Sequence, residues 1–382
     1  MQSKSVLIAG SVAQRPGRAG HTWVFLQWLL GFRRLGFQVL LVDWLTRDIC
    51  EGAIETSEHL GYLAGVMDRF GLADSFSLLD RETGEAVAGL GRREVLHRAR
   101  EAAFLLNVMG FLDDEEILGE AQRRVFLDLD PGFGQMWREL GLADIFHGHD
   151  DFVTVGHNIG NPECSIPTCG LAWITTRQPV VLKLWPARKG AGDRFTSVGS
   201  WRGPFGPIEF EGTTYGLRVH EFRKVFALPK LTSQAFELAL EIDETETRDL
   251  TQLSQSGWRL VNPLVAVGSP EAYQRYIAGS KAELMIPRSM YVQTRSGWFS
   301  DRSACYLASG RPVLAQETGF SRFLPTGEGL VAFETIEDAV AGVASIRGDY
   351  ARHASAAREL AEELLDSDRV LGRLLDRVAE GS

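Results

Sequence analysis

Residues 5–43 read SVLIAGSVAQRPGRAGHTWVFLQWLLGFRRLGFQVLLVD and carry the clearest structural signal in the chain. The apolar run at 5–10 ends in glycine, which is typical of a buried parallel strand. After a loop rich in glycine and arginine, apolar residues recur at helical spacing over 21–35, and Gly36 is suited to end that helix because glycine tolerates a positive φ. The apolar run at 37–42 predicts a second strand. This β-loop-α-β unit is typical of a Rossmann-like parallel sheet.

The rest of the first half carries weaker signals of the same kind. Short apolar runs predict further buried strands at 104–108, 125–129 and 152–155. Prolines are frequent between 162 and 186, where they disfavour helix and keep the chain extended. We therefore expect a domain boundary within 170–189, followed by an irregular loop rich in glycine and aromatic residues at 197–215.

The second half alternates between strand and helix patterns. Predicted strands lie at 236–242, 258–261, 282–287, 311–316 and 329–333. Predicted helices lie at 301–308, 335–346 and 350–378. This alternation predicts a second parallel sheet covered on both faces.

The expected fold class is therefore α/β, with two Rossmann-like doubly wound domains that face a cleft. We place the first domain at 1–178 and the second at 179–360, and we expect a C-terminal helix at 361–382 to pack back on the first domain. Ligands of such sheets bind beyond the carboxyl ends of the strands, so the cleft is the expected site.

Length and charge limit the possible functions. At 382 residues the chain is long enough for two ordinary cores. Its formal net charge of −10 argues against general nucleic-acid binding, which needs a basic surface. No apolar run approaches the roughly 18 residues of a membrane span, and the N-terminus lacks a signal-peptide pattern. Four scattered cysteines do not suggest a disulfide framework. We therefore expect a cytoplasmic protein.

The most specific pattern of the second half lies at 297–320, which reads GWFSDRSACYLASGRPVLAQETGF. It resembles the donor-binding segment of GT-B glycosyltransferases: a glycine-containing loop, a helix that ends in an alanine-small-glycine turn, a Pro-Val strand and an acidic-x-Gly loop. The similarity continues through 327–333 and the helix that follows, so it covers roughly the last third of the chain. The N-terminal GRAGH at 17–21 also resembles the glycine-rich loop with a Gly-His pair that inverting members carry.

This resemblance implies a hexosyltransferase that needs neither metal nor cofactor. The donor would be a nucleotide sugar, with a UDP or dTDP carrier favoured, and the acceptor would be a small molecule, a glycan or a protein. A homodimer is compatible with this reading. In such enzymes the histidine of the Gly-His pair is the usual general base, which implies that role for His21. The loop residues Gly20, His157 and Asn158 would face the cleft from the acceptor side.

The donor site implied by the resemblance draws on basic residues and on turns at strand ends. It comprises Arg218, Arg223, Lys224, Gly297, Trp298, Ser300, Asp301, Arg302, Glu317, Thr318, Gly319 and Phe320. Arg295 is a weaker alternative for the phosphates. One position departs from the pattern: many members place a ribose-binding glutamate where this chain has Cys305, and Asp301, one turn earlier, is a candidate replacement.

Other readings stay open at this point. A nucleotide-sugar epimerase or a phosphorylase would use the same scaffold, and a non-catalytic GT-B-like binding protein would explain Cys305. The pair Asp128 and Asp130 resembles a metal-binding Asp-x-Asp motif, but it ends a predicted buried strand in the wrong architecture. A set of histidines and cysteines has no zinc-site spacing. Its members are His147, His149, His157, Cys164 and Cys169. Neither glycine-rich loop is a dinucleotide fingerprint or a P-loop, so NAD and ATP are poorly supported.

Overall fold

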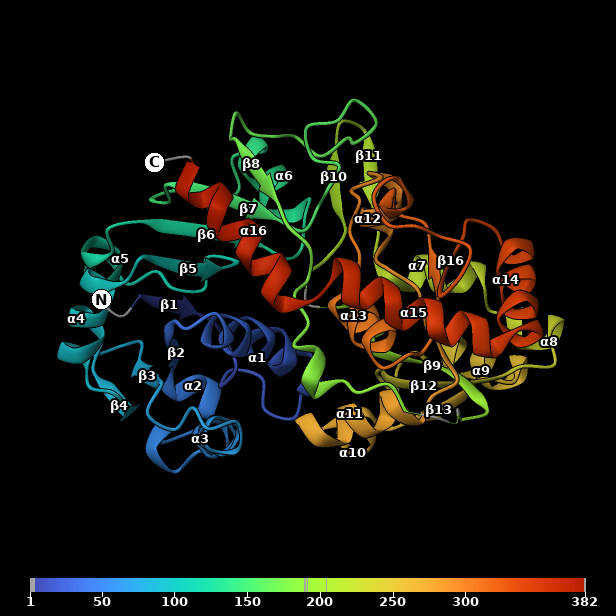
Figure 1. Cartoon of the computed structure of the whole chain (residues 1–382), viewed down its shortest axis with the longest axis horizontal. Helices are drawn as coiled ribbons and strands as arrows, with labels where there is room; N and C mark the ends of the chain where they lie inside the picture. The colour runs from blue at the N-terminus through green and yellow to red at the C-terminus, as the bar shows by residue number, and fades with distance from the viewer. Residues whose placement is uncertain (1–3, 189, 191, 204, 381–382) are drawn as a thin grey trace.

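A computed structural model describes residues 4–188, 190, 192–203 and 205–380. Two largely parallel sheets lie side by side, each with helices on both faces (Figure 1). This arrangement confirms the predicted pair of Rossmann-like domains. None of the helices in the described part of the chain combines the length and apolar character that a bilayer crossing requires.

Among the described residues, the first sheet has eight strands in the order β4-β3-β2-β1-β5-β6-β7-β8. They are β1 Ser5–Ala9, β2 Gln38–Leu45, β3 Phe76–Asp80, β4 Ala86–Gly89, β5 Phe104–Val108, β6 Arg124–Asp128, β7 Asp151–Thr154 and β8 Trp173–Thr175. Only the β3–β4 pairing is antiparallel within this described sheet. The central strands read as continuous apolar runs because helices cover both faces, and Val6, Leu7 and Ile8 are at most 1% exposed.

The second sheet has the order β13-β12-β9-β14-β15-β16, and its neighbouring strands are parallel. Its strands are β9 Arg194–Ser200, β12 Ala235–Glu241, β13 Arg259–Val261, β14 Ala282–Met285, β15 Val313–Gln316 and β16 Leu330–Phe333. A short antiparallel pair, β10 Ile208–Phe210 and β11 Thr213–Tyr215, lies outside this sheet. The carboxyl ends of strands from both sheets turn toward the space between the domains, which is where ligands of such sheets bind.

The helices alternate with the strands in both halves. In the first half they are α1 Ala19–Arg34, α2 Arg47–Cys50, α3 Glu58–Arg69, α4 Arg92–Glu101, α5 Glu115–Glu120 and α6 Phe133–Glu139. Those of the second half are α7 Arg218–Lys224, α8 Leu228–Leu231, α9 Thr247–Ser256, α10 Pro263–Val267, α11 Pro270–Gly279, α12 Ser289–Gln293, α13 Asp301–Ala308, α14 Ile336–Gly348, α15 Tyr350–Leu364 and α16 Ser367–Glu380. As predicted, α1 ends before Gly36, whose φ is 86°.

The expected irregular loop at 197–215 is wrong, because the chain there begins as β9, at the middle of the second sheet. The sequence of β9, RFTSVGS, lacks the apolar run of a typical buried strand. Its polar side chains find partners inside the domain instead: the Thr196 hydroxyl lies 2.6 Å from both the Ser280 Oγ and the Tyr306 hydroxyl. Hydrogen bonding thus allows a polar segment to occupy a core position.

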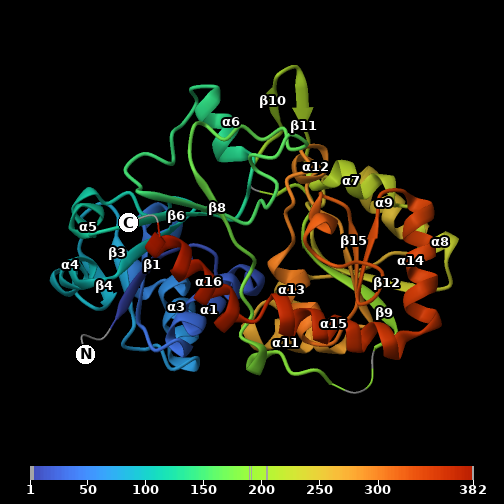
Figure 2. The same ribbon diagram turned by 45° about the horizontal axis from the view of Figure 1, so that its top comes forward.

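The tail predicted to be helical at 350–378 is helical in the structure, where it consists of two helices, α15 and α16, with a short break between them. At the break, the backbone of Val180 accepts a hydrogen bond from Ser367 N and donates one to Leu365 O. These pairings replace helical bonds and redirect the chain toward the first domain, where α16 lies along α1 (Figure 2). Arg34 of α1 makes two hydrogen bonds to the Asp368 carboxylate, at 2.8 and 2.7 Å.

The α1–α16 contact is expected to contribute measurably to stability. Leu371 of α16 is 0% exposed and packs against Gly31 of α1, where no side chain intervenes. We predict that Leu371→Ala lowers the free energy of unfolding by about 3 kcal/mol, since it removes buried methyl groups and leaves a cavity. Urea unfolding followed by circular dichroism measures this loss. The control Leu231→Ala, at a 54% exposed position, should change it by less than about 0.5 kcal/mol. An equal effect of both variants would contradict tight packing of α16.

Candidate functional site

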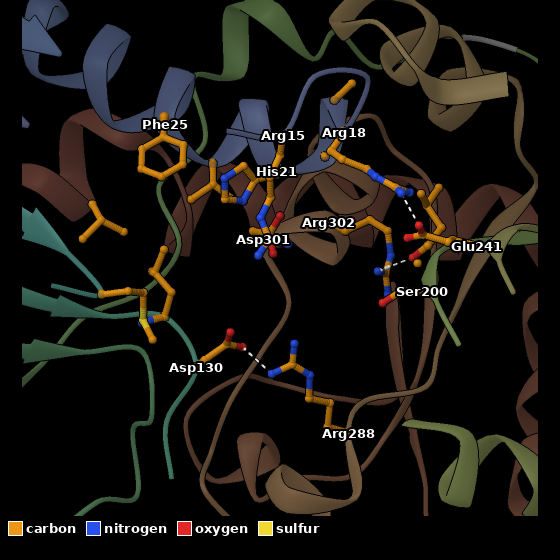
Figure 3. A pocket seen from close by; sticks show the side chains of 18 of the residues that line it. Arg15, Arg18, His21, Phe25, Asp130, Ser200, Glu241, Arg288, Asp301 and Arg302 are labelled. Atoms are coloured by element: carbon orange, nitrogen blue, oxygen red, sulfur yellow. Dashed lines mark hydrogen bonds and ion pairs between the residues drawn. The ribbon is translucent and has the colours of Figure 1, made fainter. Parts of the chain in front are cut away.

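A cavity of about 500 Å³ opens between the two sheets, and both domains contribute to its wall. First-domain residues that line it include ones that follow β5 and β6, ones in the loop that leads into α1, and ones in α1 itself and in α6. Second-domain residues include ones from the ends of β9 and β12 and from the first turns of α7 and α13 (Figure 3). The site therefore lies where ligands of doubly wound sheets bind.

The loop before α1 is held by a buried carboxylate. Asp43 lies within β2, and its Oδ2 accepts a 2.6 Å hydrogen bond from Ala13 N while its Oδ1 accepts from Gln14 Nε2 at 3.3 Å. Asp43 is 0% exposed, and this loss of hydration raises the pKa of its carboxyl to about 7. These bonds fix the loop at the carboxyl edge of the first sheet and so position the residues that follow it.

His21 stands in the first turn of α1 and lines the cavity (Figure 3). Its Nε2 lies 3.0 Å from both the hydroxyl and the carbonyl oxygen of Ser11. Loss of hydration and, to a smaller extent, repulsion from Arg15 lower the pKa of His21 to about 4. The imidazole is therefore neutral near pH 7 and has a lone pair that can accept a proton.

Positive charge gathers in the cavity although the chain as a whole is acidic. Its described lining contains the arginines Arg15, Arg18, Arg218, Arg288 and Arg302. The carboxylates in the same lining are Asp130, Glu241 and Asp301. Five cations against three anions give a local excess of two positive charges, in a chain whose formal net charge is −10. Such a site attracts an anionic ligand.

Two of these arginines are held by firm partners. The Nε of Arg302 lies 2.5 Å from Glu283 Oε1, and its Nη1 donates to Val198 O at 2.6 Å. The Nη1 of Arg288 lies 3.3 Å from Asp130 Oδ1, across the domain interface. Both guanidinium groups are thus fixed before any ligand arrives.

Arg218 differs from its neighbours because it has no carboxylate beside it in the described structure. Its Nε is enclosed without a hydrogen-bond partner among the described residues, and its Nη1 makes only a long contact, 3.4 Å, with Ser200 O. Loss of hydration and repulsion from Arg302 and Arg288 lower the pKa of Arg218 to about 9, so it remains charged near pH 7. A cation enclosed without a counter-ion is costly, and an anionic ligand would offset that cost.

Asp301 lines the same cavity from the first residue of α13. Loss of hydration raises the pKa of its carboxyl to about 6, with Arg302 acting in the opposite direction. The preceding Ser300 caps the helix, its Oγ accepting from Arg302 N at 3.2 Å, which fixes the direction of both side chains. Cys305, one turn later, is 3% exposed and lies 3.7 Å from Gln27 Nε2, outside the cavity wall.

The structure brings six of the predicted site residues to the cavity. They are Gly20, His21, Arg218, Trp298, Asp301 and Arg302. Arg223 and Lys224 do not line it: they bind Asp249 and Glu221 at 2.7 and 2.8 Å. Because successive helical residues turn by about 100°, these two side chains leave α7 in other directions than Arg218 does.

Most of the other predicted residues form a junction between the domains rather than the cavity wall. Asn158 Nδ2 donates to Arg295 O at 2.8 Å and to Gly319 O at 3.1 Å, and Gly297 N donates to Thr318 O at 2.7 Å. Next to these bonds, Glu317 accepts from Gly319 N at 2.5 Å, and Phe320 is buried. The junction supports Trp298, whose Nε1 donates to Leu129 O at 3.1 Å. Of these junction residues, Trp298 is the one that lines the cavity in the described part of the chain.

His157 lies in a separate small void at the same interface. Its ring stacks on Phe323 with 4.1 Å between centroids, and its Nε2 is enclosed without a partner among the described residues. Loss of hydration, followed by repulsion from Arg177, lowers the pKa of His157 to about 4. The residue therefore supports the domain contact and does not face the ligand.

The two aspartates considered for a metal, Asp128 and Asp130, are engaged elsewhere. Asp128 accepts from Gln135 Nε2 and Thr154 Oγ1 at 2.8 and 2.9 Å, and Asp130 binds Arg288 and the Tyr291 hydroxyl. Within the described ranges, no group of three or more histidine, cysteine or acidic side chains is arranged to hold a metal ion.

Sequence reasoning missed four charged residues of the cavity. These are Arg15, Arg18, Glu241 and Arg288. Arg18 and Glu241 form an ion pair that joins the two domains. The arginine content of the loop before α1 was a usable signal for the first two, whereas Glu241 ends β12 and Arg288 follows β14, at strand ends that resemble many others.

Known proteins share the fold but not the sequence. A scan against protein-family models finds no match, and a search of curated proteins also finds none. HepE from Anabaena, solved in complex with UDP-glucose, has a TM-score of 0.59 at 11% identity, over 98% of this chain and 99% of that chain. Sucrose-phosphate synthase from Thermosynechococcus elongatus has a TM-score of 0.58 at 12% identity, over 99% of this chain and 100% of that chain.

A third similar structure is AviGT4, a glycosyltransferase involved in avilamycin A biosynthesis. It has a TM-score of 0.55 at 12% identity, over 98% of this chain and 96% of that chain. At such identities the likeness establishes the fold alone. The chain has the GT-B fold of glycosyltransferases over nearly its whole length, as the resemblance in its last third implied.

The lowered pKa of His157 predicts a pH effect with a definite sign. The unfolded chain takes up a proton at this histidine near pH 6.5, whereas the folded chain does so only near pH 4. Its contribution to stability is therefore fully present above pH 6.5 and is lost as the pH falls toward 4. Between pH 7 and pH 5 the wild type should therefore lose on the order of 1 kcal/mol of its free energy of unfolding because of His157. We predict that His157→Phe, which keeps a ring against Phe323, does not show this loss.

The measurement compares urea unfolding of the wild type and of His157→Phe at both pH values. The difference between the two proteins should shift in favour of the variant at pH 5. A difference that does not change with pH would show that His157 titrates alike in the folded and unfolded chains.

Proposed function

We propose that this protein is a glycosyltransferase that transfers a hexose from a UDP-linked donor to an acceptor hydroxyl. One observation carries the proposal: Arg218 presents an uncompensated cation inside an arginine-rich cavity of a GT-B fold. A sugar nucleotide carries a diphosphate, whose charge would complement this site. HepE was solved with UDP-glucose bound, which supports UDP as the carrier here.

In the proposed reaction, Arg218 and Arg302 hold the diphosphate against the second domain. As the bond between the sugar and the diphosphate breaks, negative charge develops on the leaving oxygen. The Arg302 guanidinium, which Glu283 already holds in place, stabilises that charge without reorganisation, and Arg218 adds a second positive charge. The proposal therefore assigns this role to side chains and not to a metal ion.

Asp301 is the proposed partner of donor hydroxyl groups. It lines the cavity beside Arg302, whereas Cys305, which stands where many GT-B enzymes have a ribose-binding glutamate, is buried outside it. A carboxylate at this place accepts hydrogen bonds from ribose or sugar hydroxyls. Although Cys305 replaces the ribose-binding glutamate, the cavity therefore still contains a carboxylate, that of Asp301.

His21 is the proposed base for the acceptor hydroxyl. Its low pKa in the free site comes partly from Arg15. A bound diphosphate would offset the charge of Arg15 and so raise the pKa of His21 toward the range in which a histidine accepts protons effectively. Donor binding and activation of the base would thus be coupled.

Removing Arg218 should weaken donor binding without harming the fold. We predict that Arg218→Met lowers affinity for UDP-glucose by about 10- to 100-fold, since it removes charge-assisted hydrogen bonds to the phosphates. The melting temperature of the free protein should stay equal or rise, because an enclosed unpaired cation disappears. Isothermal titration calorimetry and thermal unfolding measure the two effects.

Arg223→Met is the matched control. It removes the same charge from the same helix outside the cavity, so affinity for UDP-glucose should change by less than twofold. Its melting temperature should fall instead, because Asp249 loses its ion pair. If both variants bind UDP-glucose as well as the wild type does, the assignment of the diphosphate to Arg218 fails.

The base role of His21 predicts an effect on turnover rather than on binding. We expect His21→Ala to lower the rate of UDP release from UDP-glucose by about 100-fold or more at saturating donor, because proton transfer loses its acceptor. Affinity for UDP-glucose should stay within about threefold of the wild type. Unchanged turnover in this variant would remove His21 from the reaction.

A further inference from the structure

The cavity is chemically divided between its two domains. The arginines that carry the proposed donor site lie toward the second domain and the loop before α1. In Figure 3, Phe25 stands across the opening from Arg18, Arg302 and Glu241, on the side of the first-sheet strands. The first-domain side of the lining, together with Phe205, is largely apolar.

We call this surface the apolar wall and define it by six residues. They are Met109, Phe111, Leu129, Trp137, Ile145 and Phe205. Each is only partly buried, in contrast to the fully enclosed side chains of the core beneath. Because these side chains also line the cavity, apolar surface faces the space in which an acceptor would lie. Apolar surface left in water is unfavourable, and an apolar ligand would cover it.

The aromatic members of the apolar wall are already arranged as a ring-binding surface. Trp137 and Phe205 meet edge to face, with 5.2 Å between ring centroids, although they belong to different domains. Arg288, which also lines the cavity, lies over the Phe205 ring, with its guanidinium carbon 5.4 Å from the ring centroid. A flat ligand ring would add to this cluster by stacking or edge contact.

The backbone at Met109 shows that the apolar wall is specifically built. Met109 follows β5 and has a φ of 54°, in the left-handed region that side chains other than glycine rarely adopt. Its Sδ accepts from Leu129 N at 3.0 Å, which ties two members of the wall together. Strained backbone of this kind clusters at ligand sites. The strain here places a methionine, an adaptable apolar side chain, in the cavity lining.

Hydrogen-bonding groups lie at the border of this surface. Asp130 directly follows Leu129, and His21 contacts Phe25 at 5.1 Å between centroids. One hydroxyl on a ligand could meet these groups while its body covers the apolar wall. A saccharide would instead bring many hydroxyls against six side chains that offer them almost no hydrogen bonds, and the lost hydration would disfavour its binding.

From these observations we propose that the acceptor is an apolar molecule with a flat ring and a hydroxyl group, and not a saccharide. This inference rests on the proposed transferase function for the reaction, but the ligand class follows from the apolar wall itself. Met109, Trp137 and Ile145 would determine which acceptors enter. The transferred sugar would form its new bond to the acceptor oxygen, the hydroxyl proton would pass to His21, and UDP would leave.

The test uses 2-naphthol as the ring-bearing probe and maltotriose as the saccharide probe. Binding of each to the full chain is measured by titration in the presence of saturating UDP, and binding of UDP is measured separately. We expect 2-naphthol to bind at least 10-fold more tightly than maltotriose. Ile145→Asp should weaken 2-naphthol binding at least 10-fold and leave UDP affinity within twofold. Leu142→Asp, at a 68% exposed position outside the cavity lining, is the matched control and should change neither.

A second variant guards against a folding defect. If Ile145→Asp unfolds, Trp137→Ala should produce the same loss of 2-naphthol binding with UDP affinity retained. The inference would be overturned if maltotriose bound more tightly than 2-naphthol, or if these variants bound 2-naphthol as well as the wild type does. If UDP still bound in that case, the proposed function would stand. Binding of 2-naphthol that depends on the wall, in a protein that binds no UDP, would overturn the proposed function and leave the ligand class standing.

Discussion

An enclosed guanidinium without a counter-ion is the constraint around which the cavity is organised. The folded chain keeps Arg218 charged beside Arg302 and Arg288, and the repulsion among them lowers the pKa of Arg218. Removing such a charge would stabilise the free protein, so its presence has a cost that packing does not explain. An anionic ligand would supply the counter-charge that Arg218 lacks in the free protein. The other charges of the cavity are arranged consistently with this view, since Arg302 is neutralised by Glu283 and Arg288 by Asp130.

The contact between the domains likewise depends on pairing polar groups. Asn158 from the first domain satisfies two carbonyl oxygens of the second, and Trp298 donates back to the first domain from the edge of the cavity. Polar groups that would be stranded at an interface are thereby paired. The junction and the cavity share Trp298, so the position of one wall of the site depends on bonds made well outside it. A substitution in the junction would therefore disturb the cavity without contacting a ligand.

The sequence predicted the architecture well because buried parallel strands appear in it as short apolar runs that alternate with helical patterns. Most of the central strands are largely apolar, and the helix at 301–308 was predicted with its observed bounds. The central strand β9 was missed because Thr196 and its neighbours are polar and rely on partners far away in sequence. Likewise, the break between α15 and α16 depends on Val180, which no pattern near residue 365 reveals.

The site was less predictable than the fold for the same reason. Arg218 and Arg302 were expected at the cavity and lie there, yet Arg223 and Lys224, which have the same charge on the same helix as Arg218, lie outside it. The direction in which each side chain leaves α7 decides which of them faces the cavity, and tertiary packing sets the rotation of the helix. The apolar wall was invisible in the sequence because its members are separated along the chain and meet only after the first sheet has formed.

The pairing of Val180 with Leu365 and Ser367 has a mechanical consequence. The chain passes between the domains once near Val180 and returns near Asp366, and backbone hydrogen bonds tie the two passages side by side. A single connecting strand would let one domain swivel freely about it. Two adjacent segments that are hydrogen-bonded to each other resist such twisting. The paired passages therefore join the domains at one place, and the ion pair of Arg18 with Glu241 joins them again beside the cavity.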